Sequence, residues 1–352
     1  MSDAMTLFSQ ALEQLRLVAV NVPGLTELAQ FPFLFRPLVM VVLLGVVAGV
    51  IGVIVNLRSA EFSAEAMVHA VFPGIVAGAV YWGIDAIIPA ASVVAVAAAL
   101  VLTIVSHRSR RGEASEAGTA VVLTSFFSIG LILSLAKGDM SGQLEALMFG
   151  RLLEVTDARL AQALIVCAVA LLLIAATWKE QVAYAFDRTG ARASGLRILA
   201  LDLVLNTAIA AAVVSASTAV GILLVIGYLV IPGATARVLA SRVRTMVVVA
   251  IAVGVGGGYL GMLLMVLPET LDKPISPQAT VALVMTGILL LAVGVSTARE
   301  RLDRIRHRDH SAQPVTVAAA STTAGAEATT DRAGGAEGSA SGVTPVAERG
   351  RV

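Results

Sequence analysis

The sequence predicts an all-α polytopic membrane protein that crosses a bilayer about nine times. Hydrophobic residues make up 57% of the 352 residues and charged residues only 14%, and the mean hydropathy is +0.88. Apolar runs of roughly 20 residues recur along the chain, and basic residues gather in every second segment between them. A chain with so little polar surface cannot cover a soluble globule, so the bilayer must be its solvent.

Residues 1–35 precede the first long apolar run and carry Phe8, Leu12, Leu15 and Ala19 at helical spacing. The segment lacks the basic start and long apolar centre of a signal peptide. We expect a short amphipathic helix on the extracytoplasmic membrane surface; the alternative is a loose polar leader.

The apolar runs begin after Pro37, and most are close to the length that a helix needs to cross about 30 Å of hydrocarbon. The predicted spans are 38–55, 66–83, 86–105, 118–136, 160–177, 198–216, 220–240, 246–267 and 279–295. An odd number of spans places the two termini on opposite sides of the membrane.

The distribution of basic residues predicts which side each terminus occupies, because cytoplasmic segments carry an excess of Lys and Arg. The segments after odd-numbered spans hold Arg58; His107, Arg108, Arg110 and Arg111; Lys179, Arg188 and Arg192; Arg237, Arg242 and Arg244; and Arg299, Arg301, Arg304, Arg306 and Arg308. These segments are predicted to be cytoplasmic. The N-terminus is then outside and the C-terminus inside.

Composition divides the rest of the chain into a transmembrane domain, residues 36–298, and a C-terminal tail, residues 299–352. Beyond Arg308 the tail has no aromatic residue and no helical stripe. Such a segment buries too little apolar surface to offset the entropy of ordering it. We expect a disordered cytoplasmic tail.

Glu61, Glu65 and His69 lie in the segment that enters the second predicted span, and steps of four residues place them on one helical face. Ionisable groups inside a membrane cost roughly 2.5–3.5 kcal/mol or more at its centre, so each needs a reason. A carboxylate and an imidazole one turn apart offer ligands suited to Zn, Mn or Fe(II). In the alternative, His69 is a hydrogen-bonded core residue and the glutamates solvate the helix end.

Pro-Gly pairs interrupt two of the apolar runs. Pro73 and Gly74 lie in the second predicted span, and Pro232 and Gly233 in the seventh. Proline removes a backbone donor and glycine loosens the turn, so these are candidate gating positions. Interrupted helices of opposite direction are typical of transporters whose site lies between inverted repeats; the alternative is two ordinary kinks.

No energy-converting motif accompanies the spans. The Gly-rich stretch 254–261 lacks the Lys-Ser/Thr ending of a phosphate loop and is better suited to close helix packing. The single cysteine, Cys167, excludes a thiolate cluster within one chain. A transporter that cannot hydrolyse ATP itself uses an ion gradient or a separate ATPase subunit.

Residues 178–197 are too polar to span the membrane. They are a candidate segment for docking another protein, and the alternative is a solvated connection.

Five motifs in the same order resemble the ABC-3 family of zinc/manganese/iron permeases. EAMVHAVFPG, from Glu65 to Gly74, is similar to the family pattern DALSHAVLPG. EAGTAVVLTSFFSIGLIL, LEALMFGRLLEVT, WKEQVAYAFDRTGARASGL and AVGILLVIGYLVIPGATARVLA are similar to four further family stretches. The resemblance covers roughly residues 38–295 and leaves out the N-terminal helix and the tail.

The resemblance implies a type II importer-like permease, and it assigns roles by position. Glu65 occupies the position of the family's metal-facing Asp, and His69 occupies the position of its His. Glu116 lies near an acidic pair of the family pattern and is a possible residue of the transport pathway. The stretch that the family uses as a coupling helix against its ATPase contains Glu180, Phe186, Asp187, Ala191 and Gly195.

The resemblance also implies partners. ABC-3 permeases are transport subunits, not enzymes, of bacterial plasma membranes. They work as a homodimer with two ATPase subunits and an extracytoplasmic metal-binding protein. The metal is transported as substrate and no cofactor is bound permanently. The alternatives are a gradient-driven small-molecule transporter, a permease for a metal chelate such as a siderophore, and a non-transporting membrane scaffold.

Overall fold

The computed structural model describes residues 2–108, 112–136, 150–217, 219–266 and 276–311, and within these ranges every regular element is helical. Eight helices are long and apolar enough to cross a membrane. They are α3 (Pro32–Leu57), the combined α4, α5 and η1 (Glu61–Trp82), α6 (Ile87–Arg108), α7 (Gly112–Leu135), α9 (Asp157–Ala176), α12 (Ile198–Ser217), α14 (Val243–Val266) and α15 (Pro277–Ser311). The predicted fold class is confirmed.

The seventh predicted span corresponds to α13 (Ile222–Leu239), which is shorter than the other spans. The count of about nine is reached only when α13 is included. α13 runs through Pro232 without interruption, so of the two spans that contain a Pro-Gly pair only the second predicted span is divided into separate helices. It consists of α4 (Glu61–Ala70), α5 (Phe72–Ala77) and the π-helix η1 (Gly78–Trp82).

The first span begins earlier than the sequence predicts. α3 starts at Pro32 and continues through Pro37, whereas we expected it to begin after that proline. Proline is tolerated here because it removes only the hydrogen bond to the carbonyl of Phe33, in the helix's first turn. The mistake was to treat Pro37 as a boundary.

The N-terminal segment forms α1 (Ser2–Val20) and α2 (Thr26–Ala29). Phe8, Leu12 and Ala19 pack against the protein core rather than facing outward, while Leu15 is 58% exposed. Arg16 joins the two helices, because it donates to the carbonyls of Ala29 and Gln30 and to the Glu13 carboxylate. That hydrogen bond lowers the pKa of Glu13.

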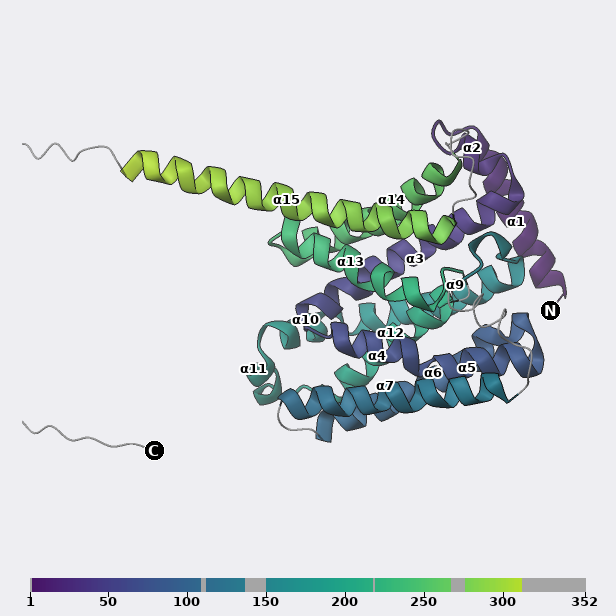
Figure 1. The fold of residues 1–352 in the computed structure, drawn as a ribbon, viewed down its shortest axis with the longest axis horizontal. Coiled ribbons are helices and arrows are strands. Elements are labelled where there is room, and N and C mark those ends of the chain that lie inside the picture. Colours follow the sequence, from purple (N-terminus) through teal and green to yellow (C-terminus); the bar gives the residue numbers. More distant parts are fainter. Residues whose placement is uncertain (1, 109–111, 137–149, 218, 267–275, 312–352) are drawn as a thin grey trace, which may run out of the picture. The chain divides into compact units, whose positions relative to one another are not determined.

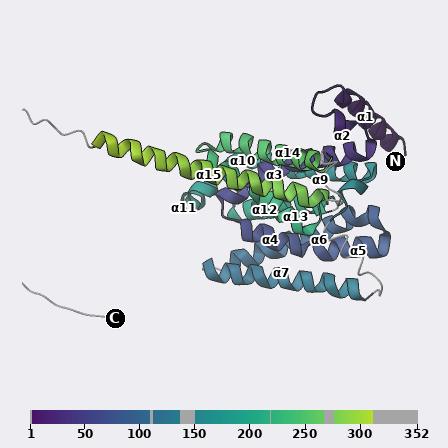
Figure 2. The same ribbon diagram turned by 45° about the horizontal axis from the view of Figure 1, so that its top comes forward.

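Two hydrogen bonds attach the N-terminal segment to the spans. Ser9 of α1 donates to Asp157 at the start of α9 (2.9 Å), where Arg36 of α3 pairs with the same carboxylate (2.5 Å). Tyr259 of α14 donates to the carbonyl of Gly24. α1 and α2 therefore lie at one end of the helix bundle, opposite α10 (Trp178–Phe186) and α11 (Arg188–Ala193), as Figures 1 and 2 show.

Glycines let α3 pack closely against α13 and α14. A Cβ added to Gly45 would lie 2.7 Å from the Gly254 carbonyl carbon, and one added to Gly49 would lie 2.7 Å from the Ile251 nitrogen. Gly52 and Gly233 meet in the same way across α3 and α13. These backbones touch because no side chain separates them, which confirms close packing as the use of the Gly-rich stretch.

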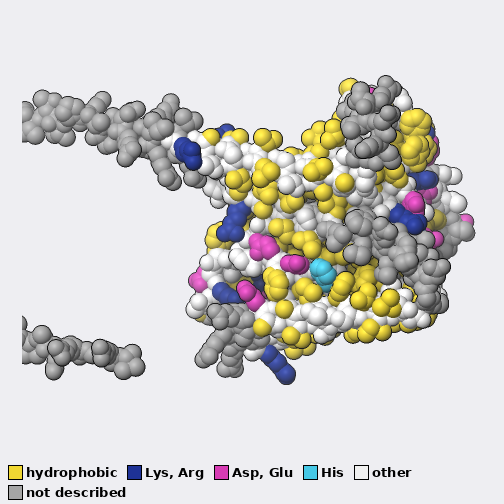
Figure 3. All heavy atoms as spheres, in the orientation of Figure 1, with side chains coloured by type: hydrophobic (Ala, Val, Ile, Leu, Met, Phe, Trp, Pro, Cys, Tyr) yellow, Lys and Arg dark blue, Asp and Glu magenta, His cyan; other side chains and the backbone are white. Residues whose placement is uncertain are grey.

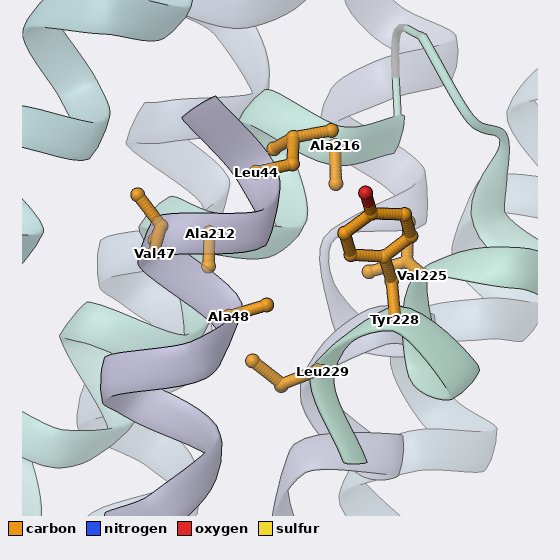
Figure 4. A pocket seen from close by; sticks show the side chains of 8 residues that line it. All are labelled: Leu44, Val47, Ala48, Ala212, Ala216, Val225, Tyr228 and Leu229. Atoms are coloured by element: carbon orange, nitrogen blue, oxygen red, sulfur yellow. The ribbon is translucent and has the colours of Figure 1, made fainter. Parts of the chain in front are cut away.

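Tyr228 holds α13 in this arrangement. Its hydroxyl, fully buried, lies 3.1 Å from the carbonyls of Val41 in α3 and Gly254 in α14. Beside it lies a small cavity between α3, α12 and α13, lined by Leu44, Val47, Ala48, Ala212, Ala216, Val225, Tyr228 and Leu229 (Figure 4). Its lining is apolar apart from the tyrosine hydroxyl, so it offers no ligand set for a cation.

α15 continues to Ser311, past the predicted start of the tail at residue 299. By its internal contacts the chain divides into residues 1–302 and residues 303–352. The tail from residue 312 onward, for which we predict disorder, lies outside the described residues.

Candidate metal pathway and coupling segment

α4 places Glu65 and His69 on one face, as predicted. Glu65 is exposed and His69 is half-buried, whereas Ala66, Met67 and Val68 between them are buried. Figure 3 shows acidic side chains and a histidine next to one another among apolar side chains. The pattern follows from helical geometry, since residues four apart share a face.

Local contacts fix the orientation of the His69 ring. Its Nδ1 lies 3.0 Å from the carbonyl oxygen of Glu65. In the neutral ring Nδ1–H donates to that carbonyl, which leaves the lone pair of Nε2 available as a ligand. Phe127 of α7 meets the ring edge-to-face at a centroid distance of 5.4 Å.

The helix junction lies two residues after His69. α4 ends at Ala70, Val71 forms a turn, and α5 starts at Phe72 with Pro73 in its first turn. The Phe72 ring stacks on Phe127 at 5.2 Å. The junction precedes the proline because Pro is favoured at a helix start. Its backbone directly follows the turn that carries His69.

Two glycines allow neighbouring helices to approach this junction. A Cβ on Gly130 of α7 would lie 3.0 Å from the Pro73 nitrogen, and one on Gly74 would lie 2.8 Å from the Ala91 Cα in α6. The structure therefore brings together two stretches that the sequence shows far apart, α4–α5 and α7.

The other sequence-predicted pathway residues lie elsewhere. Glu116 is exposed on α7, eleven positions before Phe127, which is about 16 Å along a helix. It is therefore not a ligand partner of His69. Glu61 is two turns before His69 on α4. Pro232 and Gly233 are buried on α13, where Gly233 contacts α3.

Within the described part of the chain, no three His, Cys, Asp or Glu side chains gather closely enough to hold a metal ion. The pair Glu65 and His69 is thus an incomplete ligand set. An incomplete set suits a permeation site, since binding must be weak enough for the ion to leave.

The predicted coupling segment is a helix–turn–helix. Asp187 separates α10 from α11 and caps α11, because its carboxylate accepts from the backbone N–H groups of Thr189 (3.0 Å) and Gly190 (2.8 Å). Phe186 is 71% exposed and Ala191 is buried. Gly195 ends the segment at φ +78°, a conformation that favours glycine.

The inner face of α10 is polar. Gln181 and Tyr184 are its buried residues. Gln181 donates to the Leu201 carbonyl (2.9 Å) and accepts from Arg58 (2.6 Å). Polar partners supplied by α3 and α12 make this polar face the inner one.

Sequence reasoning missed the ion pair between Arg58 and Asp202. A signal was present, because Asp202 is an acidic residue inside the predicted span 198–216. An intramembrane carboxylate implies a nearby partner. Only the fold identifies that partner as Arg58, which is distant in sequence.

The described residues contain eight long apolar helices, and one of them is interrupted next to the pair Glu65 and His69. A polar helical segment lies at one end of the bundle. These features define a membrane-spanning transport permease. Residues 30–296 match the model of the ABC 3 transport family. The chain belongs to this family.

Relatives and a solved structure agree. The chain is 34% identical over 239 residues to the manganese transport system membrane protein MntC of Listeria monocytogenes, covering 68% of this chain and 83% of that protein. It is 31% identical to the chelated iron transport system membrane protein YfeC of Yersinia pestis, covering 65% and 77%. PsaBC from Streptococcus pneumoniae, solved in complex with a Fab, has a TM-score of 0.65 and 25% identity, covering 76% and 94%.

Proposed function

We propose that this chain is the permease subunit of an ATP-driven importer for a divalent transition metal ion, Zn, Mn or Fe, in a bacterial plasma membrane. The observation that carries the proposal is the α4 face with Glu65 and His69, where Nδ1 is engaged and Nε2 is left to bind. The relatives named for manganese and chelated iron support it. Membership of an ABC transport family does not favour a gradient-driven transporter. Carboxylate and imidazole ligands suit a bare ion better than a chelate.

The permease works as a homodimer in this proposal. Glu65 is exposed in the single chain and lies within the candidate span Glu61–Trp82. A carboxylate facing lipid is costly, so this face needs protein or water beside it. A second copy facing the first would add a second Glu65 and His69 to the incomplete set.

Two copies of an ATPase subunit bind the coupling segment. Phe186 offers an exposed apolar side chain at the end of α10, and Asp187 orders the following turn. One carboxylate oxygen of Glu180 is buried without a hydrogen-bond partner among the described residues. An exposed anchor on a fixed turn is the kind of surface that a rigid partner recognises.

The coupling segment lies on the cytoplasmic side. The described basic residues at helix ends, including Arg58, Arg108, Arg188, Arg192 and Arg244, belong to segments that the positive-inside rule places in the cytoplasm. α1 and α2 then lie outside, at the end where an extracytoplasmic metal-binding protein delivers its ion.

Reporter fusions test this orientation. Fusions near Arg110, Arg192, Arg242 and the tail are expected to report a cytoplasmic location, and fusions near Ser141 and Ser276 an outside one. The reason is the arginine bias, which opposes translocation of those segments. An extracytoplasmic signal at Arg192 would overturn the coupling proposal along with the orientation.

Asp187→Arg tests the docking surface. The substitution reverses a charge and removes the α11 cap, which is worth about 1 kcal/mol, so association with the ATPase and transport are expected to fall while membrane insertion is unchanged. Asp187→Asn is the matched control, because Asn keeps the capping oxygen. Co-purification of the ATPase with the permease measures association. Unchanged recovery of the ATPase with Asp187→Arg would contradict the interface.

A further inference from the structure

Arg58 lies where three parts of the permease meet. It is the C-cap residue of α3, and three residues later Glu61 begins α4, the helix that carries Glu65 and His69. Its side chain is only 9% exposed. A buried arginine requires partners for its charge and its donors.

Each partner of Arg58 comes from another helix. One guanidinium nitrogen donates to the Gln181 side chain of α10 (2.6 Å), and another donates to the carboxylate of Asp202 in α12. The guanidinium carbon also lies 4.2 Å from the ring centroid of Tyr184, which is again in α10. Two of the three contacts thus reach the coupling segment. Only the planar guanidinium group of arginine can make all three contacts at once.

The backbone around Arg58 leaves little freedom between α3 and α4. The N–H groups of Arg58 and Ala60 donate to the carbonyls of Ile54 (3.0 Å) and Val55 (2.9 Å). Ser59 adopts φ +50°, an uncommon conformation for a residue other than glycine. The Ala60 carbonyl then accepts from Ala64 inside α4 (2.9 Å). A displacement of Arg58 is therefore passed to the start of α4.

A second set of contacts holds the same end of α3 to α13. Arg237 donates to the Asn56 carbonyl (2.8 Å), and the Asn56 side chain donates to the Val230 carbonyl (3.3 Å). The cytoplasmic end of α3 is thus held to α13 on one side. On the other side, Arg58 contacts the coupling segment.

We propose that Arg58 is the positioning residue that transmits movement of the coupling segment to α4, and so to Glu65 and His69. The inference rests on the proposed function, because it needs an ATPase that moves α10. Arg58 touches neither the metal nor ATP. Its role is to make α10, α12 and the α3–α4 turn move as one unit.

The test uses a pair of substitutions because a single one confounds function with folding. Removing Arg58 alone would leave Asp202 as an uncompensated buried charge, which is strongly destabilising, whereas replacing both partners by apolar residues is often tolerated. The variant is therefore Arg58→Met with Asp202→Leu. The matched control is Arg36→Met with Asp157→Leu, which removes an ion pair of α3 at the opposite end of the bundle.

Each variant is reconstituted with the ATPase, and metal transported per ATP hydrolysed is measured. We expect the Arg58–Asp202 variant to retain the ATPase and hydrolyse ATP, with the transport ratio at least tenfold lower. The control pair is expected to keep the wild-type ratio. Arg58→Lys keeps the positive charge but loses the planar guanidinium group, so the metal transported per ATP hydrolysed should also fall. A wild-type ratio in the Arg58–Asp202 variant overturns the inference.

A second readout follows α4 without relying on transport. Cys167 is the only cysteine of the chain and is buried, so Cys167→Ala provides a background for Phe62→Cys, at a partly exposed site in the first turn of α4. We expect ATP to change the labelling rate of this cysteine, and the Arg58–Asp202 substitutions to abolish that change. An equal ATP response in both proteins overturns the inference. Failure of the wild type to transport or to retain the ATPase would instead overturn the proposed function.

Discussion

Metal uptake should fall at least tenfold when His69→Ala and Glu65→Gln are combined, although the protein still inserts and dimerises. The double substitution removes the imidazole nitrogen and the carboxylate charge, and the described chain offers no third ligand nearby. Loss of even an outer partner of a metal ligand costs roughly 10- to 100-fold. Uptake of radiolabelled zinc, manganese and iron, at equal protein amounts, measures the effect and identifies the metal.

Three single variants separate ligand loss from disturbance of α4. Glu65→Asp restores the carboxylate that the family pattern carries and should be tolerated, whereas Glu65→Gln alone should impair uptake. Glu61→Ala should have less effect, because Glu61 lies two turns before His69, at the start of α4. Wild-type uptake of all three metals by the double variant would contradict the proposed site.

Gly254→Val should prevent stable folding, whereas Gly256→Val, two residues away on the same helix, should not. A Cβ at position 254 would lie 2.7 Å from the Gly45 carbonyl oxygen and 3.0 Å from the Gly45 Cα. Overpacking costs about 1–3 kcal/mol, and here the neighbour is backbone, which cannot rotate away. A Cβ at Gly256 meets nothing within 4 Å.

Size-exclusion profiles and thermal unfolding of detergent-purified protein measure this difference. The helix propensities of the two variants are matched, so any contrast reports the contact between α3 and α14. Gly287→Val, at another open glycine of a span, is a second control. Equal thermal stability of the Gly254 and Gly256 variants would show that α3 and α14 are not packed as described.

Much of the candidate site was predictable because it depends on local spacing. Steps of four residues place Glu65 and His69 together on any helix, and polar composition alone identifies residues 178–197 as a segment outside the membrane. The buried face of α10 was not predictable in this way. Gln181 is buried because Arg58 and the Leu201 carbonyl satisfy it, and those partners are distant in sequence.

By itself the sequence determined the fold class, most span positions and the family, since bilayer thickness imposes a run length that composition reveals directly. The tertiary structure alone decided which interrupted helix is divided, that the apolar side of α1 packs against the protein core, and which groups surround His69 and Arg58. Hydropathy reports whether a residue avoids water. It carries no information on which helix lies opposite, because that depends on glycine contacts and polar pairs between segments far apart in the chain.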